Sequence, residues 1–145
     1  MSLFAIADLH LSLNGEKPMD VFKGWHNYVE RLEKNWRRVV QEGDTVVIAG
    51  DISWAMKLED TKTDFAFIQN LPGQKWLLKG NHDYWWTTAR KMERYLTENG
   101  FDTMHILHNN ACMVGDYALC GTRGWPFDDT NAQDAKIMAV SYTHL

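Results

Sequence analysis

Three short groups of side chains in this sequence could carry out chemistry together. Asp8 and His10 are separated by one residue, Asp51 follows a glycine, and residues 80–83 read Gly-Asn-His-Asp. Each group comes after an apolar run that is typical of a β-strand. Carboxylate oxygen, imidazole nitrogen and amide oxygen suit Mn, Fe, Zn or a similar divalent ion better than they suit a thiolate-seeking metal. The three groups therefore predict a metal site, if the fold brings them together.

An alternation of strands and helices would bring them together. The apolar runs predict strands over 3–7, 45–49 and 75–79, of which the first suits burial on both faces. Helical spacing predicts helices over 25–40, within 58–70, and from a cap at Thr87 or Thr88 to Asn99. This order gives an α/β fold with a parallel sheet, in which sites gather at the carboxyl ends of the strands. Asp8, His10, Asp51 and Asn81 would then lie at one edge of the sheet.

The pattern changes after Gly100. A strand is predicted over 104–107, and a hairpin over 111–120 with its turn at Gly115-Asp116. Residues 131–139 could open a further helix. These elements indicate the beginning of a second sheet.

Composition and charge exclude several classes of function. With 145 residues and a formal net charge of −4, the chain fits one globular domain and lacks the basic balance of a general nucleic-acid or membrane-surface binder. No run is long enough to span a bilayer, and Asp8 comes too early for a signal peptide. Cys112 and Cys120 would face opposite sides of the predicted hairpin, and free thiols are typical of a cytoplasmic protein.

The chemistry that these residues could perform is hydrolysis of a phosphoester by water. A carboxylate such as Asp51 can bridge two ions about 3.5–4 Å apart, which is the spacing of two-metal hydrolytic sites. Two cations lower the pKa of a shared water and stabilise the charge that develops during in-line attack on phosphorus. His82 could protonate the leaving-group oxygen or bind a non-bridging oxygen, and Asp83 could orient His82.

The three groups, in this order and each after a strand, resemble the motifs of the calcineurin-like metallophosphoesterases from residue 3 to about residue 139. The Leu-His-Asn-Asn sequence at Leu107 and the Gly-Thr-Arg-Gly-Trp sequence at Gly121 resemble a bacterial branch of predicted phosphohydrolases in that family. The resemblance implies a four-layer α-β-β-α sandwich with a dinuclear site at the strand ends. It also implies the residue roles: Asp8 and His10 on the first metal, Asp51 bridging, Asn81 on the second metal, and His82 as the catalytic histidine.

Two departures from the family pattern bear on function. Many members carry an Asp three residues after the bridging carboxylate, where this chain has Trp54. The family's later motifs, one with a histidine ligand and one of the Gly-His-x-His type, do not occur in the sequence. We therefore interpret residues 1–139 as a partial, C-terminally truncated metallophosphoesterase domain and residues 140–145 as a non-native tail. We expect this chain to bind metal weakly and to turn over poorly.

The sequence leaves two other functions open. A nuclease or cyclic-nucleotide phosphodiesterase would be favoured if Tyr84, Trp85 and Trp86 lined the cleft and stacked a base, although such residues also serve in packing. A non-catalytic relic of the same scaffold, binding a metal or a partner, would expose an apolar patch where the second sheet should lie. Arg123, in a glycine-flanked loop, could bind phosphate bidentately or be solvated. The expected substrate is a phosphorylated small molecule or nucleotide, and the sequence leaves the metal identity and the oligomeric state open.

Overall fold

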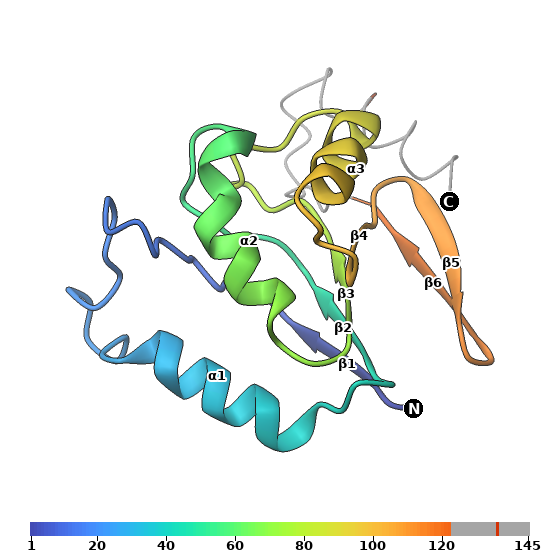
Figure 1. Cartoon of the computed structure of the whole chain (residues 1–145), viewed down its shortest axis with the longest axis horizontal. Coiled ribbons are helices and arrows are strands. Elements are labelled where there is room, and N and C mark those ends of the chain that lie inside the picture. Colours follow the sequence, from blue (N-terminus) through green and yellow to red (C-terminus); the bar gives the residue numbers. More distant parts are fainter. Residues whose placement is uncertain (123–135, 137–145) are drawn as a thin grey trace.

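Four parallel strands form the central sheet of the computed structural model, which describes residues 1–122 and 136. They are β1 (Leu3–Ile6), β2 (Thr45–Ile48), β3 (Gln74–Leu77) and β4 (Met104–Ile106), in the spatial order β1-β2-β3-β4 (Figure 1). All three pairings between neighbouring strands are parallel. The predicted α/β fold with a parallel sheet is confirmed. The carboxyl ends of β1, β2 and β3 lie side by side because the strand order follows the chain order.

One face of the sheet carries the hydrophobic core. The register places Phe4, Val46, Lys75 and Met104 in one row, and Ile6, Ile48, Leu77 and Ile106 in another row on the same face. Helices α1 (Tyr28–Val39), α2 (Lys62–Gln69) and α3 (Ala89–Glu98) cover this face (Figure 1). Their buried side chains in the core are Trp36, Phe65, Ile68, Met92 and Leu96. The sheet and the helices that cover it form a rigid base for the loops at the strand ends.

The helices begin and end close to the predicted positions. The α3 helix has Thr88 as its N-cap, whose side chain accepts a hydrogen bond from the backbone N–H of Lys91. The predicted second helix consists of a 3₁₀ turn, η1 (Leu58–Thr61), that continues into α2. The α2 helix ends at Gln69, shortly before Pro72, which cannot continue a helix.

A β-hairpin follows the parallel sheet, as predicted. Strands β5 (Asn110–Val114) and β6 (Tyr117–Gly121) pair antiparallel around the Gly115-Asp116 turn. Ala111 pairs with Cys120 and Cys112 with Leu119, which is the predicted register and places the two cysteines on opposite faces. This two-stranded sheet is separate from β1–β4. The predicted element over 131–139 lies outside the described residues except for Lys136, which is helical.

One prediction about burial is wrong. The run over 3–7 suggested a strand buried on both faces, but β1 is an edge strand of the described sheet, and Leu3 is 45% exposed. β2 has a neighbour on each side, and all four of its residues are buried. An apolar run alone does not reveal whether its strand lies at the centre or the edge of a sheet. Within the described part of the chain, no helix is both long and apolar enough to cross a membrane.

Candidate metal centre

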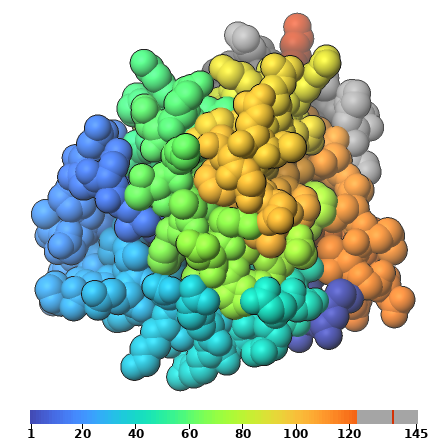
Figure 2. Space-filling model, viewed as in Figure 1, coloured from blue at the N-terminus to red at the C-terminus, as the bar shows by residue number. Residues whose placement is uncertain are grey.

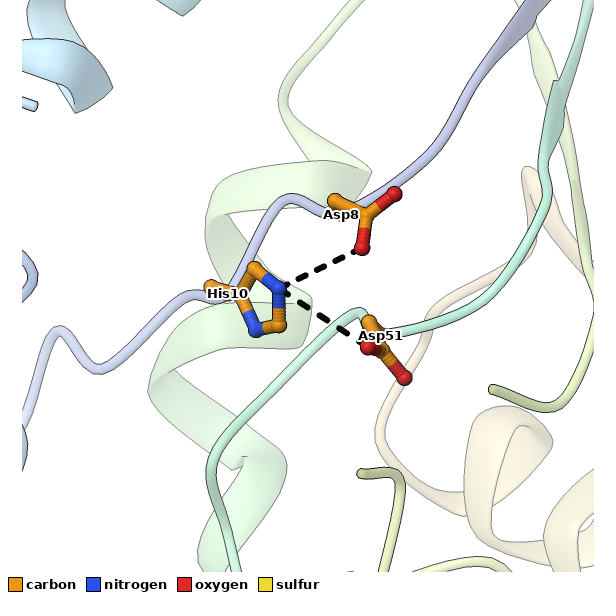
Figure 3. A group of neighbouring side chains, drawn as sticks. All are labelled: Asp8, His10 and Asp51. Atoms are coloured by element: carbon orange, nitrogen blue, oxygen red, sulfur yellow. Dashed lines mark ion pairs between the residues drawn. The ribbon is translucent and has the colours of Figure 1, made fainter. Parts of the chain in front are cut away.

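Asp8, His10 and Asp51 come together beyond the carboxyl ends of β1 and β2 (Figure 3). The Nε2 atom of His10 lies 3.4 Å from Oδ1 of Asp8 and 3.8 Å from Oδ2 of Asp51. One ligand atom from each of the three residues lies within 4.8 Å of the others. The Asp8 side chain is 63% exposed, whereas those of His10 and Asp51 are 13% and 10% exposed. The group is therefore open to solvent on the side of Asp8.

The backbone explains why these three side chains meet. The segments after β1 and β2 continue side by side, because Asp8 N–H donates to the Gly50 carbonyl at 3.0 Å and His10 N–H donates to the Asp51 carbonyl at 2.9 Å. Asp8, His10 and Asp51 all have left-handed backbone angles, with φ of 58°, 44° and 52°. Such angles cost a non-glycine residue about 1–3 kcal/mol and are concentrated at functional sites. Strand alternation does not place Asp8 and His10 on one face, since β1 ends at Ile6.

Two glycines allow the loops after β2 and β3 to approach closely. Gly50 has φ of +100°, and a Cβ atom there would lie 2.7 Å from the backbone nitrogen of Gly80. A Cβ atom on Gly80 would lie 2.1 Å from Oδ1 of Asp51 and 2.2 Å from its backbone nitrogen. Unlike Gly50, Gly80 has no positive φ. The close contact with Asp51, and not an unusual backbone angle, is therefore what requires glycine at position 80.

His82 contacts the same carboxylate of Asp51 from the third loop. Its backbone N–H donates to Oδ1 of Asp51 at 2.9 Å, and its ring Nδ1 lies 2.8 Å from Oδ2. Burial raises the pKa of the Asp51 carboxyl, but the hydrogen bonds from His82 and the nearby charges of His82 and His10 outweigh it, so the pKa lies below its usual value. Asp51 is therefore held as an anion between two histidines. Asn81 is exposed, and its side-chain amide lies 3.3 Å from the His82 ring.

Aromatic side chains surround the two histidines. Trp54 stacks on the His10 ring with centroids 5.1 Å apart, and its ring centroid is also 5.1 Å from that of His82. Trp25 meets His10 edge to face at 5.8 Å, and the Tyr28 hydroxyl donates to the His10 carbonyl at 2.8 Å. Where many members of the family that these motifs resemble carry a carboxylate, this chain places an indole ring beside both His10 and His82, whose own ring centroids are 5.9 Å apart.

Asp64 of α2 is a buried carboxylate that holds the loops after β1 and β2 through hydrogen bonds. Asp64 accepts hydrogen bonds from the Ser53 hydroxyl at 2.5 Å and from the Leu13 N–H at 2.8 Å. Burial raises the pKa of the Asp64 carboxyl above its usual value, and these hydrogen bonds oppose the rise. On the surface in Figure 2, the blue segment after β1 lies beside the green region around α2.

Asp83 contacts backbone atoms rather than the His82 ring. Its carboxylate is 1% exposed and accepts hydrogen bonds from the N–H groups of Asp51, Ile52 and Gly80, each at 2.8 Å. Ser53 N–H at 3.4 Å and the indole N–H of Trp85 at 3.1 Å complete its partners. Among the described residues, these five donors and not the imidazole surround the carboxylate. The position therefore differs from the predicted one, in which Asp83 orients His82.

Comparison with known proteins places this site in a family. A model of the calcineurin-like phosphoesterase domain matches residues 1–136. The chain belongs to the calcineurin-like phosphoesterase family. No curated protein sequence shows significant similarity to it. The crystal structure of a protein of unknown function, AQ665 from Aquifex aeolicus, matches with a TM-score of 0.53 and 19% sequence identity, over 99% of this chain and 73% of that one. At this identity, the likeness supports the fold alone.

The described residues of this calcineurin-like phosphoesterase fit a divalent cation. Two carboxylates and one imidazole converge, and carboxylates that approach one another repel unless a cation or a proton compensates them. Asp8, His10 and Asp51 could hold one ion, and Asn81 lies on the third loop with its side-chain amide 3.3 Å from the His82 ring. Hard oxygen donors with one imidazole suit Mn, Fe or Zn.

The remaining residues singled out in the sequence fall into two groups. Arg123 lies outside the described residues. Trp85 is 2% exposed and packs edge to face on Phe65 at 5.1 Å, so it belongs to the core and not to a base-stacking surface. Of the three successive aromatics, Tyr84 is exposed, and its ring centroid is 6.3 Å from that of His82.

Sequence reasoning missed the contacts of Tyr28, Ser53 and Asp64. Tyr28 and Asp64 each lie on a helix, and their neighbours in the sequence gave no signal of a role near the site. A single polar residue on a helix does not reveal which distant loop it contacts. Trp54 was noted as a departure, but its stacking on His10 depends on the parallel course of two loops.

Proposed function

We propose that this chain is a metal-dependent phosphoester hydrolase in which water attacks a phosphate mono- or diester. The observation that carries the proposal is the convergence of Asp8, His10 and Asp51 at the open carboxyl ends of β1 and β2. Family membership adds that the scaffold is a phosphoesterase domain. Divalent cations in such a site supply Lewis-acid activation of water and neutralise charge on a phosphoryl group.

Each residue of the site would have a role that follows from its position. Asp8 and His10 would hold the first ion, Asp51 would bridge to the second, and Asn81 would contribute to the second. His82 stands next to Asp51 with its side chain 39% exposed, so its ring can reach a substrate. In this position it would protonate the leaving-group oxygen or donate to a non-bridging oxygen of the phosphoryl group. Arg123 is proposed as a further contact to the phosphate.

The substrate class follows from charge and access. A net charge of −4 does not favour nucleic acid, and a phosphorylated small molecule or nucleotide can reach the open side of the site near Asp8. The core position of Trp85 excludes this residue as a base-stacking surface, which leaves the exposed Tyr84 beside His82 as the feature that favours the alternative of a nuclease or cyclic-nucleotide phosphodiesterase. We further propose a cytoplasmic location, since Cys112 and Cys120 are both free thiols.

Hydrolysis of p-nitrophenyl phosphate and of its bis-ester tests the proposal. With saturating Mn²⁺, the chain of 145 residues should hydrolyse at least one ester, slowly because the family's later motifs do not occur in it, and the reaction should stop when a chelator removes the ion. Asp51→Asn should lower the rate at least about 10–100-fold, the loss that follows from weakening even an outer partner of a metal site. Asp44→Asn is the control. Asp44 is also a buried carboxylate, but it accepts hydrogen bonds from the backbone N–H groups of Ser2 and Gln41 at the other end of the sheet.

Two results would refute the proposed function. One is release of p-nitrophenol at the same rate with and without chelator. The other is an Asp51→Asn variant as active as Asp44→Asn. Absence of any Mn²⁺-dependent hydrolysis, together with Mn²⁺ binding, would favour the non-catalytic relic that binds a metal.

A further inference from the structure

We propose that Asp83 is a positioning residue that fixes the metal centre by tying the loop after β2 to the loop after β3. The inference rests on the proposed function, because it concerns the residues that would hold the metal. We call Asp83 and its four backbone donors, on Asp51, Ile52, Ser53 and Gly80, the Asp83 clamp. Asp83 would act through Asp51 and Gly80, and it would not contact the substrate.

The geometry of the clamp connects two segments that are far apart in the sequence. Asp83 lies 32 residues from Asp51, yet its Oδ2 accepts from both Asp51 N–H and Gly80 N–H at 2.8 Å. Its Oδ1 accepts from Ile52 N–H at 2.8 Å and from the Trp85 indole at 3.1 Å. One carboxylate oxygen thus joins the β2 loop to the β3 loop directly. The other joins the β2 loop to a tryptophan buried in the core.

The chemistry of the clamp requires a carboxylate. An ionised carboxylate only accepts hydrogen bonds, and its two oxygens offer about four acceptor sites, which suits a cluster of converging N–H groups. An asparagine of the same size has one acceptor oxygen and an NH₂ group that would face further donors. At a position that is 1% exposed, such unpaired donors have no water to compensate them.

The clamp also explains where the Asp51 side chain lies. Asp51 is held through its backbone N–H by Asp83 and through its carboxylate by the backbone N–H of His82, at 2.9 Å. Both Asp83 and His82 belong to the loop after β3. Movement of that loop relative to β2 would therefore move the Asp51 carboxylate away from Asp8 and His10. The glycine contact between positions 50 and 80 leaves little space for another arrangement.

Mn²⁺ binding by Asp83→Asn tests the inference. Titration calorimetry with the full chain, at a temperature where the variant is folded, should give an affinity for the first Mn²⁺ that is about 10–100-fold weaker than in the wild type. Asp44→Asn is the matched control, because it changes a buried carboxylate that also accepts two backbone N–H bonds, at the opposite end of the sheet. It should bind Mn²⁺ within about twofold of the wild type, although both variants lose stability.

Amide hydrogen exchange without metal provides the second measurement. In the wild type, the amides of Asp51, Ile52 and Gly80 should exchange slowly for loop residues, because each is hydrogen bonded to a buried group. In Asp83→Asn they should exchange faster, while amides of β2 stay protected. This measurement does not depend on catalysis or on metal.

The outcomes separate this inference from the proposed function. If the wild type binds no Mn²⁺, the proposed function fails, and the exchange data alone decide whether the clamp exists. If the wild type binds Mn²⁺ and Asp83→Asn binds it as well as Asp44→Asn does, Asp83 is not a positioning residue. If Asp83→Asn does not fold, hydrogen exchange of the wild-type amides decides whether the clamp exists. The proposal is overturned if the amides of Asp51, Ile52 and Gly80 exchange as fast as the amides of exposed loops.

Discussion

Replacement of Gly80 by alanine is the most direct test of how the site is built. The added Cβ atom would lie 2.1 Å from Oδ1 of Asp51 and 2.2 Å from its backbone nitrogen. A backbone atom cannot move aside as the end of a flexible side chain can. Because Asp83 ties both loops together, the strain cannot be relieved by moving one loop freely.

Both stability and metal binding should respond to this change. Inserting one methyl group into such a contact costs about 1–3 kcal/mol. In a domain of this size, each kcal/mol lowers the melting temperature by about 2–4 °C, so Gly80→Ala should melt roughly 2–12 °C below the wild type. The displaced Asp51 carboxylate should also weaken the first Mn²⁺ about tenfold or more. Thermal unfolding followed by circular dichroism, and calorimetric titration with Mn²⁺, measure the two effects.

The chain offers a matched control for Gly80→Ala. At Gly43, a Cβ atom would meet nothing within 4 Å, and no positive φ stands against a side chain. Gly43→Ala should be neutral or more stable by about 0.4–1 kcal/mol, because alanine restricts the unfolded chain. If Gly80→Ala matched Gly43→Ala in both melting temperature and Mn²⁺ affinity, the close contact between the two loops would not exist as described.

Three further predictions follow from the same structure. Burial lowers the pKa of Lys75 from 10.5 to about 8. Between these pH values the Lys75 amine is therefore protonated in the unfolded chain and mostly neutral in the folded chain. The free energy of unfolding should therefore rise with pH across this interval by up to about 3 kcal/mol. Urea denaturation should show this rise in the wild type and not in Lys75→Met, and parallel pH profiles would contradict it. Ser53→Ala removes a hydrogen-bond donor from the buried Asp64 carboxylate and should lower the free energy of unfolding by about 1–3 kcal/mol. Urea denaturation at neutral pH measures this loss, and an unchanged urea midpoint would refute that contact. Mn²⁺ titration followed by electron paramagnetic resonance should show a second ion at least about tenfold weaker than the first, because, of the ligands proposed above, only Asp51 and Asn81 would serve it, and two equal affinities would disprove this.

Much of the fold could be predicted because its signals are local. The strands, the Thr88 cap and the hairpin turn follow from side-chain pattern and turn chemistry within a few residues. Asp8, His10 and Asp51 could be placed at one edge because parallel strands in chain order align their carboxyl ends. The prediction for β1 was wrong because burial of a strand depends on its neighbours and not on its own sequence.

Roles that depend on distant contacts could not be predicted. Asp83 was assigned to His82 because the two are adjacent in the sequence. In the structure its carboxylate binds backbone N–H groups of a loop about thirty residues earlier in the chain. Asp64 and Tyr28 reach the site from helices, where nothing local distinguishes them from other polar residues.

The sequence by itself determined which chemical groups this phosphoesterase domain presents and at which end of the sheet they stand. Strand order and side-chain type decide both, and each can be read from short segments. Only the tertiary structure decided how the groups are held, through the contact of Gly50 with Gly80, the Trp54 ring beside the two histidines, and the backbone donors around Asp83. The reason is physical: hydrogen bonds and close packing act over a few ångströms in space, whatever the separation along the chain.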